Sequence, residues 1–136
     1  MGISKEQAID IAAEYLEKDG WYIRHREWEF DHRHIDLACI DKDMTSLLFV
    51  EVCNGPNSHT NHYSADDAMT TATMYIMDYH LECLPLRFDR ITVKETENGT
   101  PKIKHQQNVL RINDPYVIYE QKRERDYIQR LITDNA

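Results

Sequence analysis

Two carboxylates lie in stretches of sequence where an ionised side chain is costly. Asp36 is in the middle of the segment HIDLACID (34–41), and Glu51 is inside the segment SLLFVEVC (46–53). Both segments have the apolar composition of buried β-strands. A buried carboxylate costs several kcal/mol unless a cation or a metal ion compensates its charge. Each of the two side chains is therefore expected to have such a partner.

The spacing of the two segments predicts that these carboxylates are neighbours. In a hairpin that is symmetric about residues 43–44, Asp36 lies roughly opposite Glu51. Two adjacent carboxylates repel each other, so a cation is expected between them. Mg²⁺ typically binds one or two carboxylates together with water and phosphate. We therefore expect Asp36 and Glu51 to bind Mg²⁺ or Mn²⁺, and the alternative is that one or both pair with Arg or Lys.

Helices and strands that would position the two carboxylates are predicted along the chain. Ser4 and Gln7 form a capping box that starts a first helix, and Gly20 ends it. The expected elements are a helix at 4–19, strands at 21–29, 34–41 and 46–53, a helix at 63–82, strands at 86–95 and 102–112, and a helix at 116–133. This order predicts an α/β domain with a central mixed sheet flanked by helices. Residues 113–136 would be a C-terminal helical extension of the domain formed by residues 1–112.

Several of these segments resemble a known family. The matching stretches are AAEYLEKDGWYI (12–23), HIDLACID (34–41), LLFVEV (47–52), RFDRITV (87–93) and IKHQQNVL (103–110). From about Lys5 to Leu110 the chain resembles the YraN-like family, which has the restriction-endonuclease-like PD-(D/E)XK fold. The resemblance implies a metal-dependent endonuclease that acts on nucleic acid, with Asp36 and Glu51 as its Mg²⁺ ligands.

The chain departs from the family pattern at the motif lysine, whose position is taken by Cys53. In such nucleases the lysine orients or activates water, whereas a thiol supplies no fixed cation beside a phosphate. His34 replaces a family glutamate, and Asp10 is a candidate for another glutamate in the first helix. The implied site is thus Asp36, Glu51 and Cys53, with Asp10 and His34 as accessory residues.

The supply of positive charge near this site is low. Residues 54–84 contain no Lys or Arg, so the second helix cannot replace the motif lysine. Arg87 and Arg90, which are more distant in sequence, are candidates for that role. Two functions remain open: an endonuclease-like protein with impaired or lost catalysis, and a non-catalytic module on the same fold that binds nucleic acid or protein.

Two other groups of residues have an alternative interpretation. Cys53, His59 and His62 have a spacing that would allow a zinc site, although it matches no standard zinc signature. The segment at 21–33 combines Trp, Tyr and Phe with Arg, which suits stacking on single-stranded nucleic acid. The alternative there is that Trp21 and Trp28 pack on the first helix.

Composition limits the cellular setting. The chain has 24 acidic and 16 basic residues and a net charge of −8, which disfavours non-specific DNA binding. The three cysteines are few and odd in number, which is typical of reduced thiols, and we expect a cytoplasmic protein. No apolar run is long enough to span a membrane. The last helix, with Tyr127, Ile128, Leu131 and Ile132, is a candidate surface for a homodimer.

Overall fold

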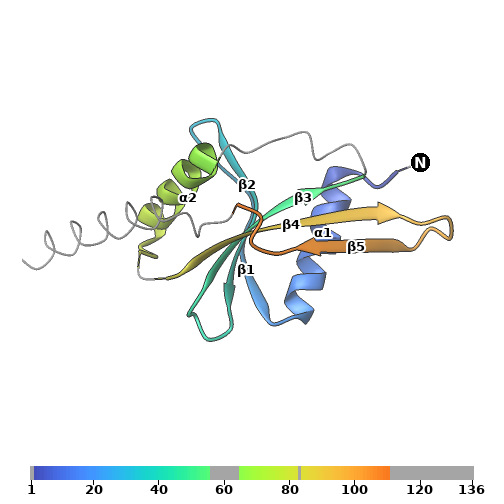
Figure 1. Ribbon diagram of the computed structural model, residues 1–136, viewed down its shortest axis with the longest axis horizontal. Helices are drawn as coiled ribbons and strands as arrows, with labels where there is room; N and C mark the ends of the chain where they lie inside the picture. The colour runs from blue at the N-terminus through green and yellow to red at the C-terminus, as the bar shows by residue number, and fades with distance from the viewer. Residues whose placement is uncertain (1, 56–64, 83, 111–136) are drawn as a thin grey trace, which may run out of the picture.

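The structure is a computed structural model that describes residues 2–55, 65–82 and 84–110. In these ranges the chain forms two helices and five strands (Figure 1). The elements are α1 (Lys5–Lys18), β1 (Trp21–Phe30), β2 (Arg33–Asp41), β3 (Leu47–Cys53), α2 (Ala65–Tyr79), β4 (Leu86–Glu95) and β5 (Pro101–Gln106). The predicted α/β architecture and the order of these seven elements are confirmed. The helix predicted at 116–133 lies outside the described residues, as does its expected role in a dimer.

The five strands form one mixed sheet in the order β1-β2-β3-β4-β5. Neighbouring strands are antiparallel except β3 and β4, which are parallel and are connected through α2. β3 is in the middle of the sheet, and six of its seven residues are buried. A nearly continuous apolar sequence such as that of β3 is typical of a strand that is covered on both faces.

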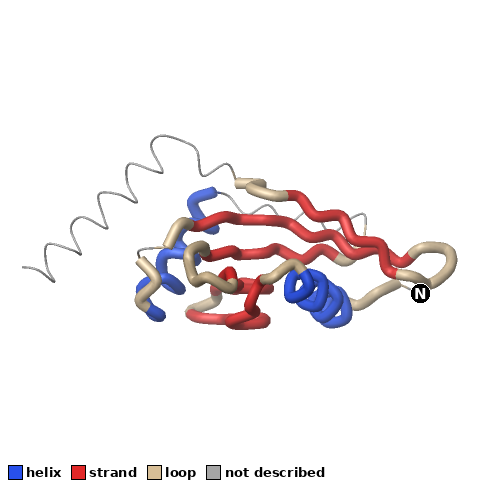
Figure 2. Tube along the Cα trace, turned by 90° about the horizontal axis from the view of Figure 1, so that it is seen from below, coloured by secondary structure: helices blue, strands red, loops and turns tan. Residues whose placement is uncertain are grey.

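Each face of the sheet has its own hydrophobic core. On one face α1 packs on a cluster that includes Leu48, Val50, Val52 and Ile91. On the other face α2 packs on a cluster that includes Phe49 and Phe88. The two helices lie toward different ends of the molecule: α1 packs across β1, β3 and β4, and α2 lies at the other end (Figures 1 and 2). The part of β4 and β5 that faces away from α1 therefore extends beyond α2.

α1 begins and ends where the sequence predicts. The Ser4 side chain accepts a hydrogen bond from the Gln7 backbone N–H, and the Gln7 side chain accepts one from the Ser4 N–H, which completes the capping box. Gly20 follows the helix with a φ of +97°, a conformation that favours glycine. No helix in the described part of the chain is long and apolar enough to cross a membrane.

The β2–β3 hairpin has the register that the sequence predicts. Leu37 pairs with Val50, and Ile40 pairs with Leu47, so the hairpin is symmetric about residues 43–44. One residue beyond the first of these pairs, Asp36 is level with Glu51. The Asp41 carboxylate closes the turn by accepting hydrogen bonds from the Thr45 hydroxyl and the Thr45 backbone N–H, both at 2.6 Å.

The fifth strand is shorter than predicted. It ends at Gln106, whereas the sequence pattern extends to residue 112. The chain turns at Asn108, which has a φ of +55° and donates its backbone N–H to Asp89 at 2.9 Å. The Val109 N–H then donates to the Phe88 carbonyl at 2.8 Å. A buried carboxylate thus competes with the strand ladder for this backbone, and alternation of side chains along the sequence does not reveal that competition.

Candidate functional site

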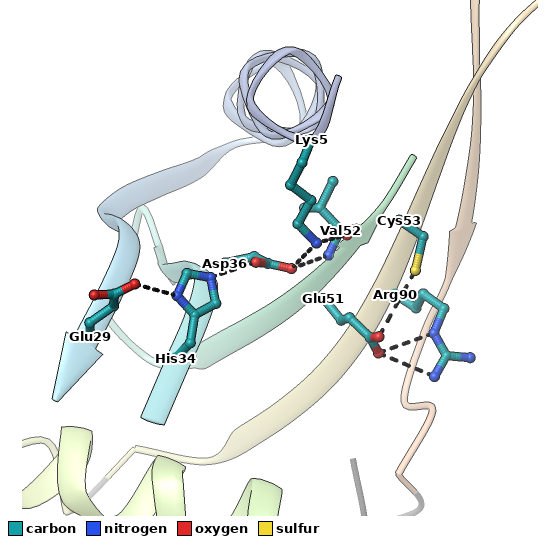
Figure 3. Close-up of polar contacts among 8 residues, drawn as sticks. All are labelled: Lys5, Glu29, His34, Asp36, Glu51, Val52, Cys53 and Arg90. Carbon is teal, nitrogen blue, oxygen red and sulfur yellow. Dashed lines mark hydrogen bonds and ion pairs between the residues drawn. The ribbon is translucent and has the colours of Figure 1, made fainter. Parts of the chain in front are cut away.

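Asp36 is buried on β2 and is surrounded by three donors. Its side chain is only 3% exposed. One carboxylate oxygen accepts hydrogen bonds from the Val52 N–H at 2.7 Å and from Lys5 Nζ at 3.0 Å, and the other accepts one from His34 Nε2 at 2.8 Å. Lys5 Nζ also donates to the Val52 carbonyl oxygen. The first turn of α1 thus supplies the cation that compensates this carboxylate (Figure 3).

Glu51 has a different cation. The parallel register of β3 and β4 places Glu51 beside Arg90, whose Nε and Nη2 atoms both donate to Glu51 Oε2 at 3.2 Å. The other carboxylate oxygen lies 4.0 Å from the Cys53 sulfur. Figure 3 shows Asp36 turned toward Lys5 and Glu51 turned toward Arg90. The register therefore brings the two carboxylates level, but their charged ends have separate partners.

A small cavity connects the two carboxylates with α2. Its lining includes His34, Asp36 and Glu51 on the sheet and Thr71 on α2, and it encloses about 30 Å³. This volume has room for about one water molecule. Both carboxylates therefore border one space, which Asp89 also lines, although no hydrogen bond joins Asp36 to Glu51 among the described contacts.

The donor set does not fit a divalent cation in this arrangement. A metal between the two carboxylates would have to compete with Lys5 for Asp36 and with Arg90 for Glu51. Among the described residues, no group of three or more His, Cys, Asp or Glu side chains is placed to hold a metal ion. The observed arrangement is the alternative that the sequence left open, in which both carboxylates pair with Lys or Arg. Binding of Mg²⁺ or Mn²⁺ stays a prediction.

The remaining predicted site residues are divided between this site and other places. His34 contacts Asp36, so the structure brings these two together. Cys53 is 2% exposed, which agrees with a small side chain filling the place of a lost lysine. Asp10 instead pairs with Arg26 of β1 at 2.7 Å and is exposed, so it does not reach Asp36.

The structure describes only part of the two alternative sites, the zinc spacing and the aromatic segment at 21–33. His59 and His62 of the proposed zinc spacing lie outside the described residues. In the aromatic segment, Trp21 packs on the α1 cluster as expected, but Trp28 packs on α2, where its indole N–H donates to the Tyr79 hydroxyl at 3.2 Å. The expectation that both tryptophans pack on the first helix is therefore wrong for Trp28, which pairs with Ile35 of β2 and joins the core on the α2 face.

Asp89 on β4 is a second buried carboxylate that the sequence interpretation missed. Arg87 donates to both of its oxygens at 2.9 Å, and His105 Nε2 lies 2.7 Å from one of them. The Asn108 N–H is a fourth donor. A signal was present, because Asp89 lies inside a segment predicted to be a strand, RFDRITV, as Asp36 lies in HIDLACID.

Lys5 is the other residue that was missed. A lysine in the first turn of a helix faces the positive end of the helix dipole, which is unfavourable. Such a position indicates that the lysine has an anionic partner elsewhere. The sequence alone does not identify Asp36 as that partner, because the contact depends on how α1 crosses the sheet.

Comparison with known proteins places the sequence of this chain in a family. Residues 9–93 match the profile of the Uncharacterised protein family UPF0102, a range that includes Asp36, Glu51 and Asp89. A UPF0102 protein of Parabacteroides distasonis is 30% identical over 97 residues, which cover 65% of this chain and 76% of that protein. A UPF0102 protein of Bacteroides thetaiotaomicron is 32% identical over 105 residues, which cover 71% of this chain and 82% of that protein.

Proposed function

Because the chain belongs to the UPF0102 family, the YraN-like family of the sequence resemblance, we propose that it is a nucleic-acid-binding domain on an endonuclease-like fold in which phosphodiester hydrolysis is impaired or lost. The observation that carries the proposal is the internal pairing of both sheet carboxylates. Lys5 compensates Asp36, and Arg90 compensates Glu51. A carboxylate whose charge is already compensated has less affinity for a catalytic cation.

Cys53 supports the same proposal. At the position where the resemblance implies a lysine, the chain has a buried thiol. The nearest described cation to Asp36 is Lys5, and its Nζ is held by both the Asp36 carboxylate and the Val52 carbonyl. An ammonium group with these two acceptors acts as a counter-ion in the fold. It therefore does not replace a lysine that must approach water or phosphate.

The test is to measure binding and cleavage on the same substrates. Labelled single-stranded, duplex and branched DNA, and RNA, are incubated with the protein in Mg²⁺ or in Mn²⁺. We expect binding to at least one substrate without cleavage. Absence of binding to every substrate would contradict the proposal and would favour a module that binds protein.

An active metal-dependent endonuclease is the second candidate. It is favoured by the position of Asp36 and Glu51, which are level on adjacent strands and border one cavity. Cleavage by the wild-type protein that is lost in both Asp36→Asn and Glu51→Gln would establish this candidate in place of the first. Cleavage only after Cys53→Lys would support the first proposal, because it would show a site disarmed at one position.

A further inference from the structure

Alternation along β4 and β5 sorts their side chains onto two faces. Ile91, Val93 and Ile103 belong to the core under α1. Residues of the other parity therefore project from the opposite face: on β4 these are Arg90, Thr92 and Lys94, and on β5 they are Lys102, Lys104 and Gln106. The cross-strand pairs Thr92–Lys104 and Lys94–Lys102 agree with this assignment.

Three lysines, Lys94, Lys102 and Lys104, gather on this face, which we call the lysine face. All three are exposed. Lys102 and Lys104 are two residues apart on one strand, so their Cα atoms are about 7 Å apart, and Lys94 is directly across from Lys102. Like charges in directly opposed positions destabilise a hairpin. A cluster of this kind is therefore more costly to the fold than three dispersed lysines.

The lysine face has little local negative charge. Among the described residues, no carboxylate lies within ion-pair distance of the three ammonium groups. Glu95 follows Lys94 in sequence, but its place in the alternation is on the other face, opposite Pro101. In a chain with a net charge of −8, these three lysines form a local cationic surface.

This surface is continuous with the candidate site. Arg90 is on the same face of β4 as Lys94 and is paired with Glu51, which borders the cavity beside α2. From Glu51 outward, the face thus runs through Arg90 to the three lysines along the β4–β5 hairpin, which extends away from α2 (Figure 1). A linear polyanion that lies along the hairpin would reach the cavity at one end.

We infer that the lysine face binds the phosphate backbone of a nucleic acid strand. This inference rests on the proposed function, and it adds the surface and the manner of binding. The argument is charge complementarity: the exposed ammonium groups are compact point charges clustered on two adjacent strands, which suits phosphate groups rather than base edges. Binding should therefore be weakly dependent on base sequence and strongly dependent on salt. Arg90 takes no part in phosphate binding while it is paired with Glu51.

The test compares two variants with the same change in net charge. Lys102→Gln/Lys104→Gln removes two charges from the lysine face, and Lys18→Gln/Lys42→Gln removes two exposed charges elsewhere. Fluorescence anisotropy with labelled DNA and RNA gives the dissociation constant over a range of salt concentrations. Thermal unfolding monitored by circular dichroism checks that both variants are folded, and Lys102→Arg/Lys104→Arg provides a variant that keeps the charge.

We expect the lysine-face variant to bind about tenfold more weakly, with a slope of log affinity against log salt that is smaller by about 1.4 on a single strand. The control and the arginine variant should bind like the wild type. Equal weakening in both charge-removal variants, or none in either, would overturn the inference while leaving the proposed function intact. If the wild type binds no nucleic acid but binds an acidic peptide, both the proposed function and the inference fail.

Discussion

Two aspartates are buried in the same sheet, and they differ in the number of hydrogen bonds that they accept and in how far their networks extend. Asp89 accepts from Arg87 twice, from the Asn108 backbone N–H and from His105, whose side chain is only 8% exposed. Asp36 accepts from one backbone N–H and from two side chains that are 45% and 35% exposed, Lys5 and His34. Four hydrogen bonds hold the first carboxylate, two of them from Arg87, which is 35% exposed, whereas three hydrogen bonds hold the second.

This difference indicates how strongly the fold depends on each carboxylate. The donors of Asp89 come from its own strand and from β5 and the turn after it, and His105 continues to Tyr15 of α1 at 3.0 Å. The network ties the helix to the edge of the sheet. Asp36, by contrast, accepts from Lys5 of α1, from His34 of its own strand and from the Val52 N–H of β3. Asp89 therefore has more donors and the longer network, and we expect the fold to depend on Asp89 more than on Asp36.

Asp89→Asn should have the largest effect on stability. Each Asp89 oxygen accepts from Arg87, so an amide nitrogen in either position faces an N–H donor and leaves the guanidinium without its anion. Removing one partner of a buried ion pair typically costs about 3 to 5 kcal/mol, and because Arg87 is 35% exposed we expect a loss at the lower end, about 3 kcal/mol. Urea unfolding measures the free energy, and Asp43→Asn, the same change at an exposed position, is the control. A loss for Asp89→Asn no greater than that of the control would refute the structural role.

Asp36→Asn should destabilise the protein less, by about 1 to 3 kcal/mol. The amide oxygen can still accept from the Val52 N–H, and His34 can change tautomer to accept from the amide nitrogen. Lys5 then loses its counter-ion but remains partly hydrated. A double-mutant cycle with Lys5→Met isolates the ion pair, and a coupling energy of about 1 kcal/mol is expected for a partly exposed pair. A loss for Asp36→Asn larger than that for Asp89→Asn would reverse the comparison.

Tyr15→Phe removes the hydroxyl that is hydrogen-bonded to His105, the residue that connects Asp89 with α1. If His105 donates to Asp89 through Nε2, its Nδ1 accepts from the Tyr15 hydroxyl, and removal of that hydroxyl leaves an acceptor unpaired on a side chain that is 8% exposed. We expect a loss of about 1 kcal/mol in the free energy of unfolding. Tyr22→Phe is the matched control, because Tyr22 is 65% exposed. Equal stability of the two variants would mean that the network ends at His105.

The sequence predicted much of the frame that holds these carboxylates. Apolar periodicity and turn residues were sufficient for α1, for the order of the five strands and for the register that brings Asp36 level with Glu51, because these features depend on neighbouring residues. The sequence could not identify which cation pairs with which carboxylate. Lys5 and Asp36 are 31 residues apart, and Arg90 and Glu51 are 39 apart, so both contacts depend on the packing of whole elements.

Replacement of Asp41, the last residue of β2, should have the smallest effect on the free energy of unfolding, and this effect should change only at acid pH. The Thr45 hydroxyl, followed by the Thr45 and Ser46 backbone N–H groups, holds the pKa of this exposed carboxyl below its usual value. A depressed pKa stabilises the fold above the unfolded value, and this contribution is lost as the pH falls below about 4. Urea unfolding from about pH 6 to about pH 3 should therefore show wild type and Asp41→Asn converging in stability toward acid. A stability difference that stays constant over this range would mean that the Asp41 charge does not stabilise the turn that sets the register of Asp36 and Glu51.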